Sequence, residues 1–364
     1  MPKLNNDFLQ TIVLLTIILV LLFFNWTLSK AESESSEIKE PTNVLFDKST
    51  NTLQLDSLTL KQKIAQMIVT NGDENAKDEL QKMLIGGIYL GAKPSKESYI
   101  DSIKNFQDGA VIPFFVTIDL EGCWNPFENF QKFPTLKEIK TKEDAYQVGF
   151  DEGKLLKELG FSIDFSPVVD LNDTIWNCRS FTGTPEEIAE KANFYIKGLQ
   201  ENGILATSKH YPGKTLSIRD PHQYITYATI DDSDLMPFKK TIGSNVSAIM
   251  ISHVIVNGLV DSESKPSVVS QKLVSGLRNQ FAGLIVTDEV HMLGLYKYYT
   301  DADRMCVDLF KADNDLVLYF DANPKDLYHM ISIVEDAVKR GEISEKRIDA
   351  SVTRILEAKG IQVV

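Results

Sequence analysis

The sequence has 364 residues, of which 43% are hydrophobic and 24% are charged, as is typical of a globular protein. This length is sufficient for one large α/β barrel or for two modest domains. The formal net charge of −13 argues against a nucleic-acid-binding protein, because such proteins need a basic surface against the phosphates.

The N-terminal residues 1–31 form a region distinct from the rest of the chain. Residues 8–28 are uncharged and almost wholly apolar, and about 20 such residues span a bilayer as a helix. A cleaved signal peptide normally has a shorter apolar core, of about 7–15 residues. We therefore expect a transmembrane signal anchor with the following domain outside the cytoplasm. Cleavage after Ser29-Lys30-Ala31, which would give a secreted protein, is the alternative.

Residues 32–57 are polar and acidic, and they predict a flexible tether between the membrane and a folded domain at residues 58–364. In that domain, segments of helical spacing alternate with short apolar runs. We expect strands at 85–90, 111–118, 162–168, 203–210, 248–252, 283–288 and 315–320, and helices at 60–69, 95–107, 142–159, 185–202, 272–281 and 325–339.

This alternation predicts a parallel sheet, and the number of units indicates an α/β fold of the closed (β/α)8, TIM-type barrel class. An open, doubly wound sheet is the alternative. No glycine-rich dinucleotide fingerprint follows the first predicted strand, so the sequence does not support a nucleotide site.

Charged and imidazole side chains stand at or just after the predicted strand ends. In a barrel these ends meet at one mouth, where catalytic groups are found, whereas unpaired charges in a barrel core would be costly. We therefore expect one site that contains Asp119, Asp170, Lys209, His210, His253 and Asp288.

Two of the candidate groups point to particular chemistry. Asp220 stands two residues before His222 in a loop opened by Pro212-Gly213, and a carboxylate beside an imidazole can fix its tautomer for acid/base catalysis. The alternative is a surface turn with a solvated histidine. Asp288 ends an apolar strand and is a candidate nucleophile or base, although a helix N-cap favours aspartate equally.

Several ordered motifs resemble glycoside hydrolase family 3, and most closely its β-N-acetylhexosaminidase branch. The strongest match is Lys209 to Gly213 followed, at the family's separation, by Asp220-Pro221-His222. The others are Gly283 to Asp288, which matches the nucleophile segment, and the stretches 60–67, 118–122, 164–170 and 179–181. The resemblance extends from about Leu58 to about Gly360.

The resemblance implies a retaining hydrolase that removes terminal β-linked N-acetylglucosamine from cell-wall fragments or other glycans. In that scheme Asp288 attacks the anomeric carbon, and His222, oriented by Asp220, protonates the leaving oxygen and then deprotonates water. The sugar hydroxyls would be bound by Asp119, Arg179, Lys209 and His210.

Four positions depart from the family pattern. Cys123-Trp124-Asn125 replaces Gly-Arg-Val, Phe127 replaces an arginine that contacts sugar, Lys214-Thr215 replaces His-Gly, and Asp313 replaces a glycine. The first two bear on sugar specificity. Trp124 or Phe127 is a candidate to stack on a sugar, with core packing as the alternative.

Two alternative functions remain: a catalytically degenerate, membrane-tethered glycan-binding protein, and a β-glucosidase.

The five histidines and three cysteines show no metal-ligand spacing, so we expect no metal and no cofactor. Cys306 lies in a predicted helix and is expected to be a core residue. Cys123 and Cys178 lie in loops after consecutive strands, which predicts a disulfide between them. Two unpaired thiols are the alternative, because a cytoplasmic orientation would keep them reduced.

Overall fold

The computed structural model describes residue 38, residue 41 and residues 43–320 and 323–364. The expected transmembrane segment, residues 8–28, lies outside these residues, as does the alternative cleavage site after Ala31. Within the described part of the chain, no helix is both long and apolar enough to cross a membrane. Residues 41–364 form one compact unit.

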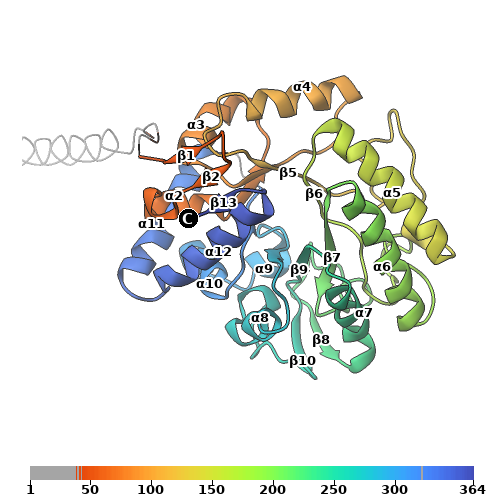
Figure 1. Cartoon of the computed structure of the whole chain (residues 1–364). Helices are drawn as coiled ribbons and strands as arrows, with labels where there is room; N and C mark the ends of the chain where they lie inside the picture. Colours follow the sequence, from red (N-terminus) through yellow and green to blue (C-terminus); the bar gives the residue numbers. More distant parts are fainter. Residues whose placement is uncertain (1–37, 39–40, 42, 321–322) are drawn as a thin grey trace, which may run out of the picture. The chain divides into compact units, whose positions relative to one another are not determined.

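The core of this unit is an eight-stranded parallel sheet in the order β11-β9-β7-β6-β5-β4-β3-β12. The two outermost strands meet through a parallel bridge between Val286 and Leu316, with Thr287 N donating to Leu316 O at 2.9 Å. The sheet is therefore an almost closed barrel of the TIM type rather than an open sheet (Figure 1). Its strands are β3 (Ile68–Asn71), β4 (Gly87–Tyr89), β5 (Phe115–Ile118), β6 (Ile163–Asp164), β7 (Leu205–Tyr211), β9 (Ala248–Ile251), β11 (Leu284–Thr287) and β12 (Val317–Leu318).

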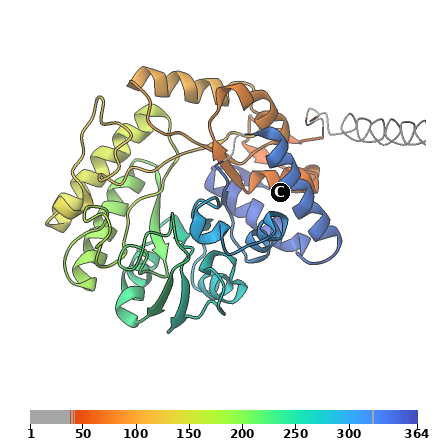
Figure 2. The same ribbon diagram turned by 180° about the vertical axis from the view of Figure 1, so that it is seen from behind.

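A helix follows each of these strands, and the helices lie outside the barrel in both views (Figures 1 and 2). This arrangement covers the outer face of the sheet, so β5, β9 and β11 are buried along their whole length. The helices are α3 (Lys77–Met83), α4 (Lys96–Gln107), α5 (Lys142–Leu159), α6 (Pro185–Glu201), α7 (Asp232–Gly243), α8 (Gln271–Arg278), α10 (Ala302–Lys311) and α11 (Pro324–Lys339); the flanking helices are α2 (Leu60–Gln66), α9 (Leu293–Tyr296) and α12 (Glu345–Ala358).

The sequence encodes the ends of these helices by local chemistry. At the start of α5, Thr141 and Asp144 form a reciprocal capping box that satisfies otherwise unpaired backbone N–H groups. The same helix ends at Gly160 with a φ of 97°, a left-handed conformation that glycine adopts without a steric penalty. At α6, Thr184 caps a helix whose first residue is Pro185.

The expected helix at 60–69 is wrong at its C-terminal end. The helix stops at Gln66, and β3, the first barrel strand, begins at Ile68. Ile68, Val69 and Thr70 are fully buried between β12 and β4. A strand that is covered on both faces has no polar alternation, so it reads as the end of the preceding amphipathic helix.

The expected strand at 111–118 is also too long, because only Phe115–Ile118 is extended in the sheet. Pro113 lies just before it and lacks the N–H that a central strand would need. Helices α3, α7 and α12 were not expected from the sequence, whereas α10 contains Cys306, which we expected to lie in a helix.

Two small sheets flank the barrel. In the first, β1 (Phe46–Asp47) pairs with β2 (Thr52–Leu53), and β13 (Gln362–Val363) pairs with the other edge of β2. Strands β1 and β2 and the 3₁₀ turn at Leu55–Ser57 fall in the segment 32–57 that the sequence assigns to a tether, so the folded unit extends N-terminal of residue 58. In the second, β8 (Tyr227–Ile230) runs parallel to β10 (Ile255–Gly258).

Candidate active site

A cavity of about 420 Å³ opens at the carboxyl ends of the barrel strands. Most of its walls are polar or aromatic, and they come from segments far apart in the chain. Its lining residues are Tyr89, Asp119, Glu121, Cys123, Trp124, Trp176, Arg179, Asp220 and His222. The fold therefore brings four of the residues predicted from the sequence to this one cavity: Asp119, Arg179, Asp220 and His222.

A network of alternating charges forms one wall of this cavity. Lys209, at the end of β7, pairs with Asp119 and lies 2.5 Å from Glu121 Oε1. Arg179 donates through Nε and Nη2 to the two oxygens of Glu121, at 2.5 and 2.7 Å. Glu121 and Lys209 are both almost wholly buried. Three of the four predicted sugar-binding groups thus belong to one network, in which Glu121 links Arg179 to Lys209 and Lys209 in turn contacts Asp119. Our sequence analysis did not single out Glu121.

Burial and the two cations act in opposite directions on these carboxyl groups. Burial raises the pKa of Glu121, but the charges of Arg179 and Lys209 outweigh it and hold that pKa well below the usual range. For Asp119, burial prevails over the attraction of Lys209, and its pKa is raised. Of the two carboxyl groups, Glu121 is therefore the one whose ionised form is more strongly favoured.

His210, the fourth predicted sugar-binding residue, is held separately by Asp170. Its Nδ1 lies 2.7 Å from Asp170 Oδ2, and its backbone N–H donates to the same oxygen at 3.1 Å. Both residues are buried. Two contacts from one carboxylate fix the orientation of the imidazole ring at the end of β7.

Asp288 lies directly after β11 and is half-buried. Its backbone N–H donates to Ile251 O at 3.0 Å, and its Oδ1 accepts from Glu289 N at 2.9 Å. The helix-cap alternative is wrong, because the next helix, α9, begins only at Leu293.

The charge environment of Asp288 favours its ionised form. Burial raises its pKa, but the neighbouring imidazoles of His210, His253 and His222 outweigh burial, so the pKa lies below its ordinary value. An anionic carboxylate is what a nucleophile at this position requires.

His222 and Asp220 form a dyad on the loop between β7 and β8. His222 Nδ1 lies 2.7 Å from Asp220 Oδ1, and its backbone N–H donates to the same oxygen at 2.9 Å. The side chain of His222 is half exposed but lies in the cavity wall. It is therefore an oriented imidazole at the site rather than a histidine on an unrelated surface turn.

The dyad loop rests on the segment that follows Asp288. Leu293 N donates to His222 O at 3.1 Å, and Gly294 N donates to Pro221 O at 3.0 Å. A Cβ atom at Gly294 would lie 2.5 Å from Pro221 O and 2.8 Å from Tyr224 O, so only glycine permits this contact.

Trp176 is a second site residue that the sequence analysis did not identify. The Arg179 guanidinium lies over its ring at 4.6 Å, and the His222 ring meets it edge-on with centroids 5.8 Å apart. Tyr89, from β4, also lines the cavity and was likewise missed. Glu121 lay within the quoted motif at 118–122, whereas no local pattern marked Tyr89 or Trp176.

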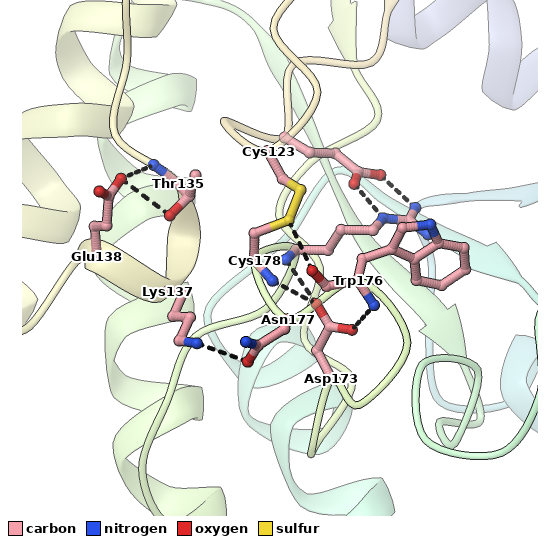
Figure 3. Close-up of a disulfide and its surroundings, with 10 residues drawn as sticks. Cys123, Thr135, Lys137, Glu138, Asp173, Trp176, Asn177 and Cys178 are labelled. Carbon is pink, nitrogen blue, oxygen red and sulfur yellow. Dashed lines mark hydrogen bonds and ion pairs between the residues drawn. A yellow bond between two sulfur atoms is a disulfide. The ribbon is translucent and has the colours of Figure 1, made fainter.

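The predicted Cys123–Cys178 disulfide is confirmed, with a Cα–Cα distance of 5.4 Å (Figure 3). Asp173 organises the Cys178 loop by accepting backbone N–H bonds from Trp176 at 2.9 Å, Cys178 at 2.9 Å and Arg179 at 2.8 Å. Cys306 is a buried free thiol in α10, as expected.

The two aromatic departures from the family pattern differ in their surroundings. Phe127 is fully buried and packs edge-on against Tyr99 with ring centroids 5.1 Å apart, so it fills the core. Trp124 is 68% exposed and lines the cavity. Of the other two departures, Lys214 pairs with Asp234 at 3.2 Å, and Asp313 pairs with Arg347 at 3.6 Å.

The remaining histidines have structural partners. His253 is buried, with Nε2 2.8 Å from Glu289 O, and burial lowers its pKa. His291 contacts Glu289 at 2.8 Å, and His329 contacts Asp303 at 3.2 Å on the surface. Among residues 43–320 and 323–364, no three histidine, cysteine or acidic side chains are grouped to hold a metal ion.

Known proteins are similar to this chain in sequence and in fold. The chain is 26% identical over 330 residues to the beta-hexosaminidase LpqI of Mycobacterium bovis, covering 83% of each chain. It is 25% identical over 301 residues to a beta-N-acetylglucosaminidase/beta-glucosidase of Cellulomonas fimi, covering 76% of this chain and 52% of that protein. A glycoside hydrolase family 3 beta-N-acetylglucosaminidase from Paenibacillus has a solved structure that matches with a TM-score of 0.74 at 27% identity, covering 83% of this chain and 62% of that one.

The family model for the glycosyl hydrolase family 3 N-terminal domain matches residues 59–358, which is most of the chain and all of the barrel. Carbohydrate is the substrate class of this family, and hydrolysis of O-glycosyl bonds is its reaction. The protein is therefore a glycoside hydrolase that belongs to family 3.

Proposed function

We propose that the protein is a retaining, exo-acting β-N-acetylhexosaminidase that removes terminal β-linked N-acetylglucosamine from cell-wall fragments or glycans. What supports this proposal is the Asp220–His222 dyad in the cavity wall, on a loop that two backbone hydrogen bonds hold against the segment that follows Asp288. The names of the hexosaminidase relatives support the choice of sugar.

In the proposed mechanism, the Asp288 carboxylate attacks the anomeric carbon while the bond to the leaving oxygen breaks. With Nδ1 of His222 held by Asp220 at 2.7 Å, the proton that moves is the one on Nε2. His222 gives this proton to the leaving oxygen, and a covalent glycosyl-enzyme forms. Water then attacks the anomeric carbon, His222 takes its proton, and Asp288 leaves.

The hydroxyl groups of the terminal sugar would be bound by Asp119, Arg179, Lys209 and His210. Lys209 and Arg179 are held in position by Glu121, and His210 is held by Asp170. Groups that are oriented before the substrate arrives lose little entropy on binding, which favours charge-assisted hydrogen bonds to the sugar.

The activity is tested with chromogenic β-N-acetylglucosaminide and β-glucoside under matched conditions. We expect the first to be cleaved at least about tenfold more efficiently, with retention of the anomeric configuration by proton NMR. A preference for the glucoside would indicate a β-glucosidase. Binding of the sugar without turnover of either substrate would indicate a degenerate, glycan-binding member of the family.

We also propose that the barrel acts outside the cytoplasm, tethered by the N-terminal segment or secreted after its cleavage. The Cys123–Cys178 disulfide supports this location, because such bonds form and persist in oxidising compartments. Labelling of intact cells with a thiol reagent that cannot cross membranes, before and after reduction, tests the side on which the barrel lies.

A further inference from the structure

Two tryptophans stand at the mouth of the cavity, on the two loops that the disulfide joins. Trp124 directly follows Cys123, and Trp176 precedes Cys178 by two residues. Both line the cavity, and neither takes part in the proposed chemistry. Figure 3 shows Trp176 on the same loop as Cys178, with its backbone near the disulfide.

The Trp124 loop is fixed to the Trp176 loop at two points. Glu121 forms the bidentate ion pair with Arg179, and two residues later Cys123 is bonded to Cys178. Between them Gly122 has a φ of 72°, and Glu121 N donates to Trp124 O at 3.2 Å, which closes a tight turn. Trp124 therefore projects from a constrained turn although 68% of its surface is exposed.

Trp176 is constrained in a different way. The Arg179 guanidinium lies over its ring at 4.6 Å, and the ring edge contacts His222. Trp176 is half-buried and Trp124 is largely exposed, so each presents part of its indole ring at the cavity rim in a constrained position that suits ligand contact.

We propose that Trp124 and Trp176 form the binding site for the second sugar ring of the substrate, on the leaving-group side of the cleaved bond. The Cys123–Cys178 disulfide holds their two loops together. This inference rests on the proposed function, because His222 marks the position of the leaving oxygen, and Trp176 lies against His222. The occupant is a pyranose ring, whose C–H face packs against an indole while its hydroxyl groups stay hydrated.

The test compares two substrates that share the terminal sugar and differ in the second ring. Methyl β-N-acetylglucosaminide has no second ring, and N,N′-diacetylchitobiose has one. Trp124→Ala should raise the KM for the disaccharide about tenfold more than the KM for the methyl glycoside, as expected for loss of one aromatic contact. The Cys123→Ser/Cys178→Ser double variant should shift the ratio in the same direction. Tyr227→Ala, which removes a side chain of similar exposure (66%) outside this cavity, should leave the ratio unchanged.

The inference would be overturned if Trp124→Ala changed the KM for both substrates equally, so that the ratio of the two KM values stayed as in the wild type. If the wild-type protein hydrolyses neither substrate, the proposed function fails, and the inference is then decided by calorimetric binding of the disaccharide. Binding that weakens in Trp124→Ala but not in Tyr227→Ala supports the site. Binding that is absent, or unaffected by Trp124→Ala, overturns it.

Discussion

Arg179 and Glu121 form a two-point ion pair at the base of the loops that frame the cavity, with N–O distances of 2.5 and 2.7 Å. The residues are 58 positions apart and belong to the loops after consecutive barrel strands. Because Lys209 contacts the same carboxylate, Glu121 fixes two cations relative to one another.

We expect Glu121→Gln to destabilise the fold by about 3–5 kcal/mol, because it leaves Arg179 and Lys209 with less compensating charge in a buried site. Denaturant unfolding measures the change. Glu190→Gln, which removes an exposed pair with Lys142, is the matched control and should have little effect. Similar losses in both variants would show that Glu121 has no special role.

The same variant has a pH signature. The pKa of Glu121 in the folded state lies below its ordinary value of 4.5, so its contribution to stability is present above about pH 4.5 and is lost as the pH falls towards the folded pKa. Wild-type stability should therefore decline in that acid range more steeply than the stability of Glu121→Gln.

Asp288→Asn should lower kcat by about three orders of magnitude or more, because the amide cannot serve as the nucleophile. The thermal unfolding temperature should stay close to that of the wild type, since within residues 43–320 and 323–364 the Asp288 side chain accepts a single hydrogen bond, from Glu289 N. Turnover within about tenfold of the wild-type rate would remove Asp288 from this role.

The acid limb of kcat/KM should lie below the ordinary aspartate pKa of 3.8. The neighbouring imidazoles hold the pKa of Asp288 down despite its burial, so the carboxylate stays ionised as the pH falls to that value. An activated aryl glycoside is the appropriate substrate, with circular dichroism at each pH to exclude unfolding. A limb well above pH 4.5 in folded protein would contradict this assignment.

His222→Ala should slow the hydrolysis of substrates with poor leaving groups by about 10²–10⁴-fold and that of activated aryl glycosides much less. An activated leaving group needs little protonation, so it tolerates the loss of the acid. His329→Ala removes a histidine–carboxylate pair on the surface and should affect both classes equally little. Equal slowing of both classes by His222→Ala at the glycosylation step would argue against the acid role.

Reduction of the Cys123–Cys178 bond should lower the stability of the fold by about 4 kcal/mol, because it releases a closed loop of 55 residues in the unfolded chain. The measurement is urea unfolding with and without reductant. The Cys123→Ser/Cys178→Ser variant should no longer respond to reductant. A response that persists in the double variant would assign the effect to another group.

The barrel and much of its site were predictable because parallel strands end at the same face. The position of a residue after an apolar run was enough to predict that it lies at the barrel mouth, as for Asp119, Lys209 and Asp288. The disulfide followed from the same geometry, since Cys123 and Cys178 lie in the loops of consecutive strands.

What could not be predicted depends on contacts between distant segments. The strand β3 is buried on both faces and therefore resembles the end of the helix before it. The role of Glu121 could not be predicted, because it depends on contacts with Arg179 and Lys209, which are distant in the sequence. The orientation of the Trp176 ring depends on its contacts with Arg179 and His222, and the residues next to Trp176 in the sequence do not specify that packing.

The contact between Gly294 and the carbonyl of Pro221 links the two halves of the candidate catalytic machinery. The loop that carries His222 takes its position from the segment that carries Asp288, through two backbone hydrogen bonds and a close approach that a side chain would block. Redesign by loop exchange must respect this link. If the loop that carries Asp220 and His222 is replaced by that of another family member, the imidazole will keep its orientation only if the segment at residues 289–296 is replaced together with it.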